Sequence, residues 1–114
     1  MQYMILNYVP PATVGPDGLP QFTDMALWEA YTKALIDAGV MRGGNALHVG
    51  ATATTVRVRE GQRDLHDGPY ADSKEELGGY FIIEVDTLDD ALLWAARNPA
   101  ASSGAVEVRP ILSP

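Results

Sequence analysis

Apolar and polar residues follow different periods along the chain, and each period predicts a type of element. Residues 2–9, QYMILNYV, are almost continuously apolar and rich in aromatic and β-branched side chains, which predicts a strand buried on both faces. The run GYFIIEV at residues 79–85 is the strongest strand signal in the chain. The run AVEVRPIL at residues 105–112 predicts a closing strand.

Two segments have the apolar period of a helix that buries one face. The first spans about residues 23–38, with Thr23 as its N-cap and Gly39 as its stop signal. The second follows Thr87, which we expect to cap it, and ends at Pro99. The stripes expected to be buried are Trp28, Tyr31, Leu35 and Ile36 in the first helix, and Leu88, Ala91, Leu92 and Ala95 in the second.

The middle of the chain predicts a short strand followed by a hairpin. Residues 40–49, VMRGGNALHV, indicate a strand interrupted by glycines. From residue 52, TATTVRVRE alternates β-branched and polar side chains, which is the period of a half-buried strand. Glu60 and Gly61 then suit a hairpin turn, with QRDLH at residues 62–66 as the returning strand.

The order of these elements predicts an α+β fold in one domain, residues 1–114. Two β-α-β units around a hairpin give a ferredoxin-like sandwich, an antiparallel sheet with two helices on one face. Two helices cover only one face of such a sheet, although the strands are apolar on both. We therefore expect a homodimer in which a second copy covers the other face, sheet against sheet.

Composition narrows the functional classes. The formal net charge is −7 and no Lys/Arg cluster occurs, so the sequence lacks the footprint of proteins that bind nucleic acid or anionic membrane surfaces. The apolar runs are too short to span a bilayer, and the first residues do not have the pattern of a signal peptide. With no cysteine, disulfides and thiolate metal sites are excluded. We expect a cytoplasmic protein without a membrane or nucleic-acid partner.

The run from residue 67 to residue 79 carries a family resemblance. It is an ordered motif, DGPYADSKEELGG, flanked by ATATTVRVREGQ before it and by YFIIEVDTLDDALLWAARNPAA after it. The motif resembles the D-G-P-F-x-E-[ST]-K-E-x-[LI]-G-G signature of the YCII-related proteins of the DGPF group. Tyr70 stands where that signature has Phe, and Asp72 where it has Glu. The resemblance covers roughly the last two thirds of the chain.

The resemblance implies a ferredoxin-like fold of the dimeric α/β-barrel superfamily, which agrees with the element order. Most members of the group have no established activity. Some YCII-type relatives are thought to use a His–Asp pair in a pocket, and one relative is a dehydrochlorinase of a chlorinated hydroxyquinol. Genes for DGPF proteins often lie beside extracytoplasmic-function sigma factors, which implies a possible protein partner in transcription.

Two histidines and one aspartate are the candidates for acid–base chemistry. Histidine is the usual general base near neutral pH. His66 and Asp67 are adjacent, and successive side chains of a strand point to opposite faces, which disfavours them as a pair. His48, at the end of a predicted strand, is the better base if the hairpin brings it near Asp67. The alternatives are an exposed loop position for His48, and for Asp67 the turn chemistry of Asp-Gly-Pro.

Further residues are candidates for contacts with a ligand. Tyr70 would line the pocket or act as a plain apolar anchor, and Tyr80 would line the pocket or belong to the core or a dimer contact. Glu84 and Arg109 interrupt apolar strands and would either line the pocket or form a cross-strand ion pair with each other. The charged run SKEELGG favours a solvated surface loop. No histidine spacing typical of a metal site occurs, and we expect no cofactor.

Two classes of function remain open. One is the binding of a small polar or aromatic metabolite in a pocket between sheet and helices, with His48 as base and Asp67 orienting it. The other is a non-catalytic dimeric module that serves a protein partner such as a sigma factor. The first predicts a cavity where His48 and Asp67 converge, and the second an exposed apolar patch elsewhere.

Overall fold

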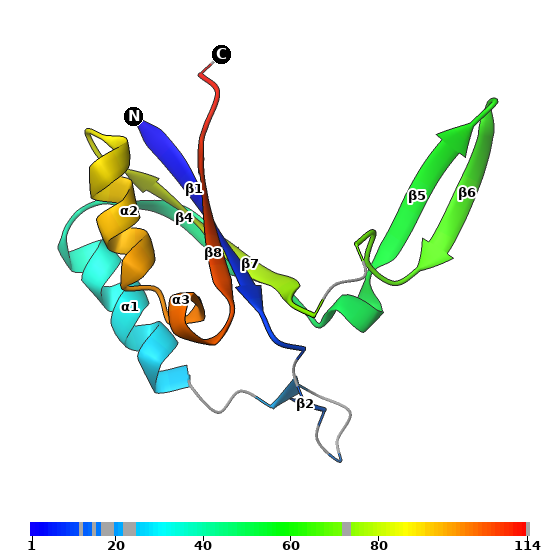
Figure 1. Ribbon diagram of the computed structural model, residues 1–114, viewed down its shortest axis with the longest axis horizontal. Helices are drawn as coiled ribbons and strands as arrows, with labels where there is room; N and C mark the ends of the chain where they lie inside the picture. The colour runs from blue at the N-terminus through cyan, green and yellow to red at the C-terminus, as the bar shows by residue number, and fades with distance from the viewer. Residues whose placement is uncertain (12, 15, 17–19, 22–24, 72–73, 114) are drawn as a thin grey trace.

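A four-stranded antiparallel sheet with all its helices on one face forms the body of the molecule, and a hairpin projects from it (Figure 1). The computed structural model describes residues 1–11, 13–14, 16, 20–21, 25–71 and 74–113. The strands of the body are β1 (Gln2–Val9), β4 (Met41–Ala46), β7 (Glu76–Glu84) and β8 (Ala105–Pro110). Its helices are α1 (Met25–Asp37), α2 (Leu88–Ala96) and the short α3 (Ala100–Ser103). A 3-10 turn (η1, Gly50–Thr52) follows β4, and β2 (Thr13–Val14) pairs with β3 (Pro20–Gln21).

The strand order β4-β7-β1-β8 confirms the predicted ferredoxin-like α+β fold. β1 pairs antiparallel with β7 and with β8, and β4 pairs antiparallel with β7 at the edge of the sheet. The predicted strand at residues 79–85 begins earlier than expected, because β7 already starts at Glu76. The register with β1 shifts between Asn7 and Tyr8, which places a bulge at the start of β7.

The core lies between the sheet and α1 and α2. Alternate side chains of β1 and β7 point into it, and Ile5 and Ile83 are completely buried there. Leu35 of α1 is also completely buried, and the Tyr31 ring meets the Phe81 ring edge-on at 5.4 Å between centroids. The sequence predicted a strand at residues 2–9 buried on both faces, whereas within one chain only its alternate residues Tyr3, Ile5 and Asn7 are buried.

The predicted apolar stripe of the second helix is wrong in half of its members. Ala91 and Ala95 are buried, but Leu88 and Leu92 are exposed. The two rows lie about 60° apart around the helix, and the alanine row faces the sheet because its small side chains allow a close approach. Thr87 caps the helix as expected: its hydroxyl accepts the backbone N–H of Asp90 at 3.1 Å.

The first helix shows the same pattern of partial agreement. Tyr31 and Leu35 are buried and Trp28 packs against the core, but Ile36 is exposed. Its predicted cap, Thr23, lies outside the described residues. In the described part of the chain, no helix has the length and apolarity needed to cross a bilayer.

The opposite face of the sheet carries half-buried apolar side chains, among them Met4, Leu6 and Ile82. We call it the open face, because the three helices all lie on the other side (Figure 1). The described residues place no further layer on it. This is the surface for which the sequence predicted a second copy of the chain.

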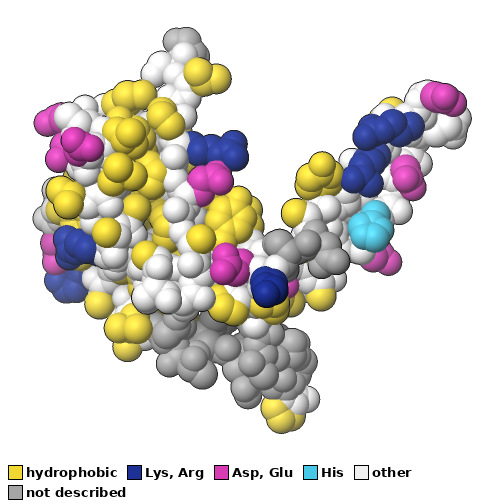
Figure 2. Space-filling model, viewed as in Figure 1, with side chains coloured by type: hydrophobic (Ala, Val, Ile, Leu, Met, Phe, Trp, Pro, Cys, Tyr) yellow, Lys and Arg dark blue, Asp and Glu magenta, His cyan; other side chains and the backbone are white. Residues whose placement is uncertain are grey.

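The hairpin of β5 (Thr54–Arg59) and β6 (Gln62–Asp67), here called the arm, stands away from the body (Figures 1 and 2). The predicted turn is confirmed, since Glu60 and Gly61 both have positive φ angles of 52° and 75°. The predicted half-burial of β5 is wrong within one chain: all its residues except Thr55 are exposed. The radius of gyration is 16.0 Å, although a compact chain of this length has about 13 Å.

Candidate functional site

A pocket with a cavity volume of about 600 Å³ lies at the edge of the sheet beside α1. Its walls come from the end of β1 and the two prolines after it, from the outer residues of α1, from β4 with the segment that follows it, and from the start of β7. The volume falls within the range of small-molecule sites. These walls are brought together by the pairing of β4 with β7, which places the edge of the sheet against α1.

Aromatic side chains form one wall of the pocket. Trp28 of α1 and Phe81 of β7 have nearly parallel rings, 15° apart in orientation with centroids separated by 6.4 Å. Met25 and Met41 extend this apolar surface along α1 and β4. Such a surface suits a flat apolar or aromatic molecule, because aromatic rings offer large contact areas and favourable ring–ring geometry.

Behind this wall, the hydroxyl of Tyr31 donates to the backbone oxygen of Trp94 at 2.9 Å. Burial raises the pKa of Tyr31 to about 12, and this effect outweighs the opposing influences of a hydrogen bond from Asn98 and the charge of Arg97. The phenol is therefore neutral at physiological pH and holds α1 to the end of α2. It fixes the helix that carries Trp28.

Glu76 supplies a carboxylate to the pocket and joins two of its walls. Its Oε2 accepts the backbone N–H of Gly50 at 2.7 Å, which ties η1 to the start of β7. A carboxylate has about four acceptor positions, so Glu76 retains acceptor capacity for a ligand. Sequence reasoning missed this residue, because SKEELGG suggested a solvated loop, whereas Glu76 is half-buried and paired with Val9 in the sheet.

Asn7 is a second lining residue that the sequence did not single out. Its Oδ1 accepts the Nδ2 of Asn98 at 2.8 Å, and Asn98 in turn accepts the backbone N–H of Ala100 through its own Oδ1. Both asparagines are buried. The amide of Asn7 in the middle of the apolar run QYMILNYV was the available signal, since buried polar side chains require partners.

Gly78 and Gly79 allow the strands of the pocket to approach closely. A Cβ atom at Gly79 would lie 2.8 Å from the backbone oxygen of Asn45, and one at Gly78 would lie 2.7 Å from a methyl of Val9. Both glycines line the pocket. The glycine pair of the motif thus shapes this end of the sheet through close contact between neighbouring strands.

His48 and Tyr80 are the predicted site residues that line the pocket. His48 follows β4 and is exposed to solvent at the pocket wall. Tyr80 lies opposite Asn45 in the β4–β7 pair, and its hydroxyl accepts the Nδ2 of Asn45 at 2.9 Å. His48 thus follows the edge strand β4, and Tyr80 lies on the neighbouring strand β7.

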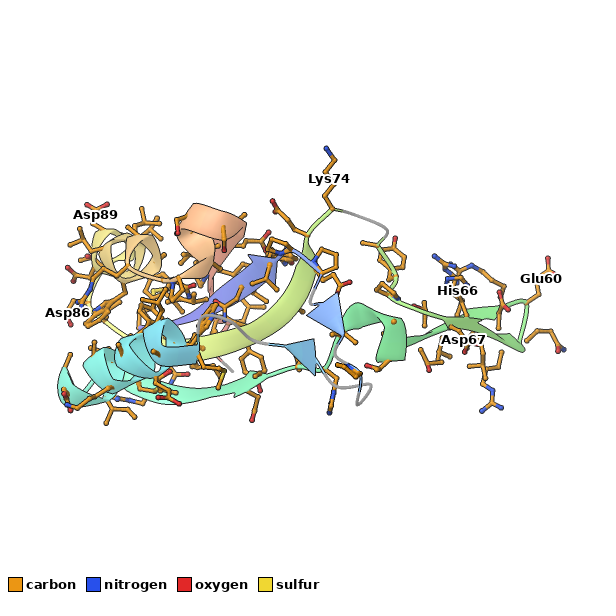
Figure 3. The ribbon with its side chains drawn as sticks, turned by 90° about the horizontal axis from the view of Figure 1, so that it is seen from below. Glu60, His66, Asp67, Lys74, Asp86 and Asp89 are labelled. Carbon is orange, nitrogen blue, oxygen red and sulfur yellow. The ribbon has the colours of Figure 1, made fainter. Side chains whose placement is uncertain are left out.

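Asp67 and Tyr70 lie at the arm, outside the residues that line the pocket. Asp67 ends β6 opposite Thr54, and Figure 3 shows it and His66 projecting from opposite sides of the arm. Gly68 turns the chain with a φ of 111° and donates its N–H to the oxygen of Ala53 at 2.7 Å. The chain thus bends at Gly68, directly after β6, and the role of the Asp67 side chain stays a prediction.

The ring of Tyr70 lies under the guanidinium of Arg57, whose Cζ is 5.2 Å from the ring centroid. Such a cation–π contact is weak at an exposed site, and the Tyr70 side chain is largely exposed. Tyr70 thus packs against Arg57 of β5.

Glu84 and Arg109 belong to the open face and do not pair with each other. β1 separates their strands, so the expected cross-strand pair is wrong. Glu84 instead lies 3.5 Å from Arg42, and Arg109 contacts Glu107 within its own strand. Neither lines the pocket. The described residues contain no cluster of three or more groups that could bind a metal ion.

Comparison with known proteins gives the family. The sequence model of the YCII-related domain matches residues 1–113. The chain belongs to the YCII-related family. A curated relative, the uncharacterized protein R00369 of Rhizobium meliloti (strain 1021), is 34% identical over 84 residues, which are 72% of this chain and 68% of that protein. The matched range includes the DGPYADSKEELGG motif.

Proposed function

We propose that this YCII-related protein binds a small, flat, uncharged or cationic molecule in the pocket beside α1. The observation that carries the proposal is the composition of the lining: an aromatic wall, two amides, a carboxylate and an imidazole. Among the described residues that line the pocket, none is Lys or Arg. An anionic ligand would lose its contact with water and would find no cationic partner among these residues. Burial of an unpaired charge is unfavourable.

Glu76 and His48 give the ligand its orientation in this proposal. Both line the pocket together with the apolar residues of α1. A hydroxyl or amine on the ligand would donate to Glu76, while the flat portion of the ligand would lie against Trp28. Each hydrogen bond to a charged acceptor contributes about 1.5–3 kcal/mol when its partner is otherwise well placed.

A panel of benzyl alcohol, benzylamine and benzoate tests the proposal by isothermal titration and thermal shift. These molecules have the same ring and differ in charge. We expect the alcohol and the amine to bind and to raise the melting temperature, and benzoate to bind at least about tenfold more weakly, which corresponds to about 1.4 kcal/mol. Binding of benzoate with equal or higher affinity would contradict the proposal.

The two histidines provide a matched pair of variants. His48→Ala should weaken binding of the preferred probe by about tenfold, the loss of roughly one hydrogen bond. His66→Ala removes the same side chain from the arm, outside the pocket, and should leave the affinity unchanged. Equal effects of the two variants would contradict a role for His48.

Proton transfer by His48 is a further part of this proposal. Imidazole is suited to this step near neutral pH. Glu76 shares the pocket with His48, whereas Asp67, the partner suggested by the sequence, is on the arm. The pair His48–Asp67 stays a prediction. Asp67→Asn should abolish turnover if it orients His48, and Glu76→Gln should do so if Glu76 is the partner.

A protein-binding module is the second candidate function, and α2 supports it. Leu88, Leu92 and Leu93 are exposed on this helix, and Figure 2 shows hydrophobic side chains gathered over it. The patch lies away from the pocket, as this alternative requires. Titration with a purified extracytoplasmic-function sigma factor would test it. Binding should be lost in Leu92→Lys, and absence of binding by the unmodified chain would contradict it.

We also propose that a second copy of the chain covers the open face. The support is the row of half-buried apolar side chains at Met4, Leu6 and Ile82, which the helices leave uncovered. Apolar surface of this kind is usually buried in a layer of secondary structure. Sedimentation velocity should show a dimer at micromolar concentration, and a monomer would contradict this part of the proposal.

A further inference from the structure

We propose that the arm grips the body of a second copy, so that its apolar side is buried in the dimer. This inference rests on the proposal that a second copy covers the open face, and it adds the arm to the same interface. The partner is a second chain of the same sequence. Three observations support the proposal: the exposure of one side of the arm, the area that the dimer requires, and the distribution of charge.

One side of the arm is apolar and exposed. Val56 lies opposite Leu65 in the hairpin, and Val58 lies opposite Arg63. Because alternate residues of a strand share a face, the two valines and the leucine form one row. Their exposed fractions are 56% for Val56, 61% for Val58 and 53% for Leu65. An isolated two-stranded hairpin is only marginally stable in water, so the row needs a covering surface.

The chain itself leaves the arm held mainly at its base. Gly68 donates its N–H to Ala53, and the hydroxyl of Thr55 donates to the oxygen of Gly68 at 2.9 Å. Figure 2 shows a deep notch between the arm and the body. The notch leaves space for another molecule between them. Covering by a second molecule is therefore compatible with the shape.

The arm adds to the area that the open face offers to a second copy. Four strands of about seven residues give that face a planar extent of about 19 by 24 Å, or roughly 450 Å². Standard interfaces bury about 800 Å² of accessible surface on each partner, so additional contact through the arm favours a stable dimer. If each copy gives an arm and receives one, the arm and its docking surface raise the area to about 850 Å² per copy. The two contacts are then identical by two-fold symmetry, as expected for a homodimer.

Charge also favours the body of a second copy as the partner. The arm carries three arginines and three acidic residues, so the formal charge of −7 lies entirely on the rest of the chain. Arg63 is exposed on the apolar side of the arm, opposite Val58, whereas Arg57 and Arg59 are exposed on its other side. Like charges facing each other across an interface disfavour association, and a formally neutral arm avoids this repulsion against the acidic body of another copy. The arm is thus the part of this acidic chain that is best suited to contact another copy.

A pair of matched point variants tests the proposal. Leu65→Lys places a charge in the apolar row of the arm, and Leu93→Lys makes the same change at a comparably exposed leucine of α2, which is 68% exposed. Sedimentation velocity over a range of concentrations gives the dimer dissociation constant. We expect Leu65→Lys to raise it at least about tenfold and Leu93→Lys to leave it unchanged.

Removal of the arm provides the second test. Ala53 and Gly68 are joined by a hydrogen bond of 2.7 Å, so residues 54–67 can be replaced by Asn-Gly, a two-residue turn that closes a hairpin. We expect a folded monomer. If Leu65→Lys and the excised chain both form dimers of unchanged affinity, the proposed role of the arm is overturned. The proposal that a second copy covers the open face is then unaffected. A wild-type monomer overturns both. The pocket assays with benzyl alcohol remain independent of either result.

Discussion

The body and the arm contain strands of similar sequence pattern, but only the body buries them. Ile5 in β1 and Ile83 in β7 are 0% exposed, because α1 and α2 lie over that face of the sheet. Val56 and Val58 in β5 alternate in the same way and remain exposed, because no described element of the chain lies over the arm. Alternation thus predicts a strand, whereas burial depends on a second layer that the pattern does not specify.

The open face is intermediate between these two regions. Its side chains, such as Leu6 and Ile82, are half-buried by their neighbours within the sheet, although no helix covers them. It belongs to a stable four-stranded sheet, unlike the arm, which has two strands. The difference implies that the body folds without the arm, while the arm depends on association.

Truncation of an apolar side chain should give the largest difference in stability loss between the body and the arm. Ile83→Ala creates a cavity in the core and should lower the free energy of unfolding by about 2–5 kcal/mol. Val58→Ala removes two methyl groups from an exposed position and should change it by less than about 0.5 kcal/mol in the monomer. Urea denaturation of both variants at low protein concentration provides the measurement. Similar losses for both would show that the arm packs within one chain.

Alkaline pH should destabilise the body through Tyr31. Burial raises its pKa from 10.0 to about 12 in the folded state. The stabilisation is therefore complete below pH 10 and is lost as the pH rises to 12, since the unfolded phenol ionises first. The loss is at most about 2.7 kcal/mol. Tyr31→Phe removes this pH dependence, which denaturation at pH 9 and pH 11 can measure. If Tyr31→Phe loses as much unfolding free energy between pH 9 and pH 11 as the unmodified chain, Tyr31 is not the source of the pH dependence.

Two glycine substitutions should separate close packing in the body from turn geometry in the arm. Gly79→Ala forces a Cβ to within 2.8 Å of the Asn45 backbone oxygen, and overpacking of this kind costs about 1–3 kcal/mol. Gly61→Ala has open space around it but a φ of 75°, so its strain of about 1 kcal/mol remains local to the arm. The melting temperature should be lowered by Gly79→Ala only. The reverse order would contradict the account.

A pair of threonine variants should give the smallest effect. Thr87→Ala removes the N-cap of α2, which should lower the free energy of unfolding by about 1 kcal/mol. Thr55→Ala removes a hydrogen bond at the base of the arm and should change global unfolding by less than about 0.5 kcal/mol. Chemical denaturation distinguishes them. A larger loss in Thr55→Ala would mean that the arm belongs to the cooperative unit of the body.

Most of the fold followed from periodicity, because each core strand and helix has an internal pattern. The strand at residues 2–9, the hairpin turn at Glu60 and the cap at Thr87 all depend on local physical preferences. The choice of Ala91 over Leu92 as a buried residue depends instead on the distance between helix and sheet. The absence of a cover over β5 likewise depends on the position of every other element, which no local pattern encodes.

The site was predicted less completely than the fold. His48 and Tyr80 line the pocket, and their part in binding or catalysis stays a prediction. Glu76 was missed because its charged neighbours dominate the local pattern, and only the pairing of β7 with β1 and the N–H of Gly50 place it at the wall. Convergence of residues from separate strands is a tertiary property, so sequence spacing alone did not predict the set.

Hydrogen exchange of the arm amides tests the central claim most directly, that association with a second copy completes what one chain leaves exposed. Exchange should be measured for β5, β6 and β1 at two protein concentrations, one above and one below the dimer dissociation constant. The account predicts that the arm is protected at the high concentration and loses most of its protection at the low one, while β1 stays protected at both. Exchange in the arm that is equally fast, or equally slow, at both concentrations would contradict it.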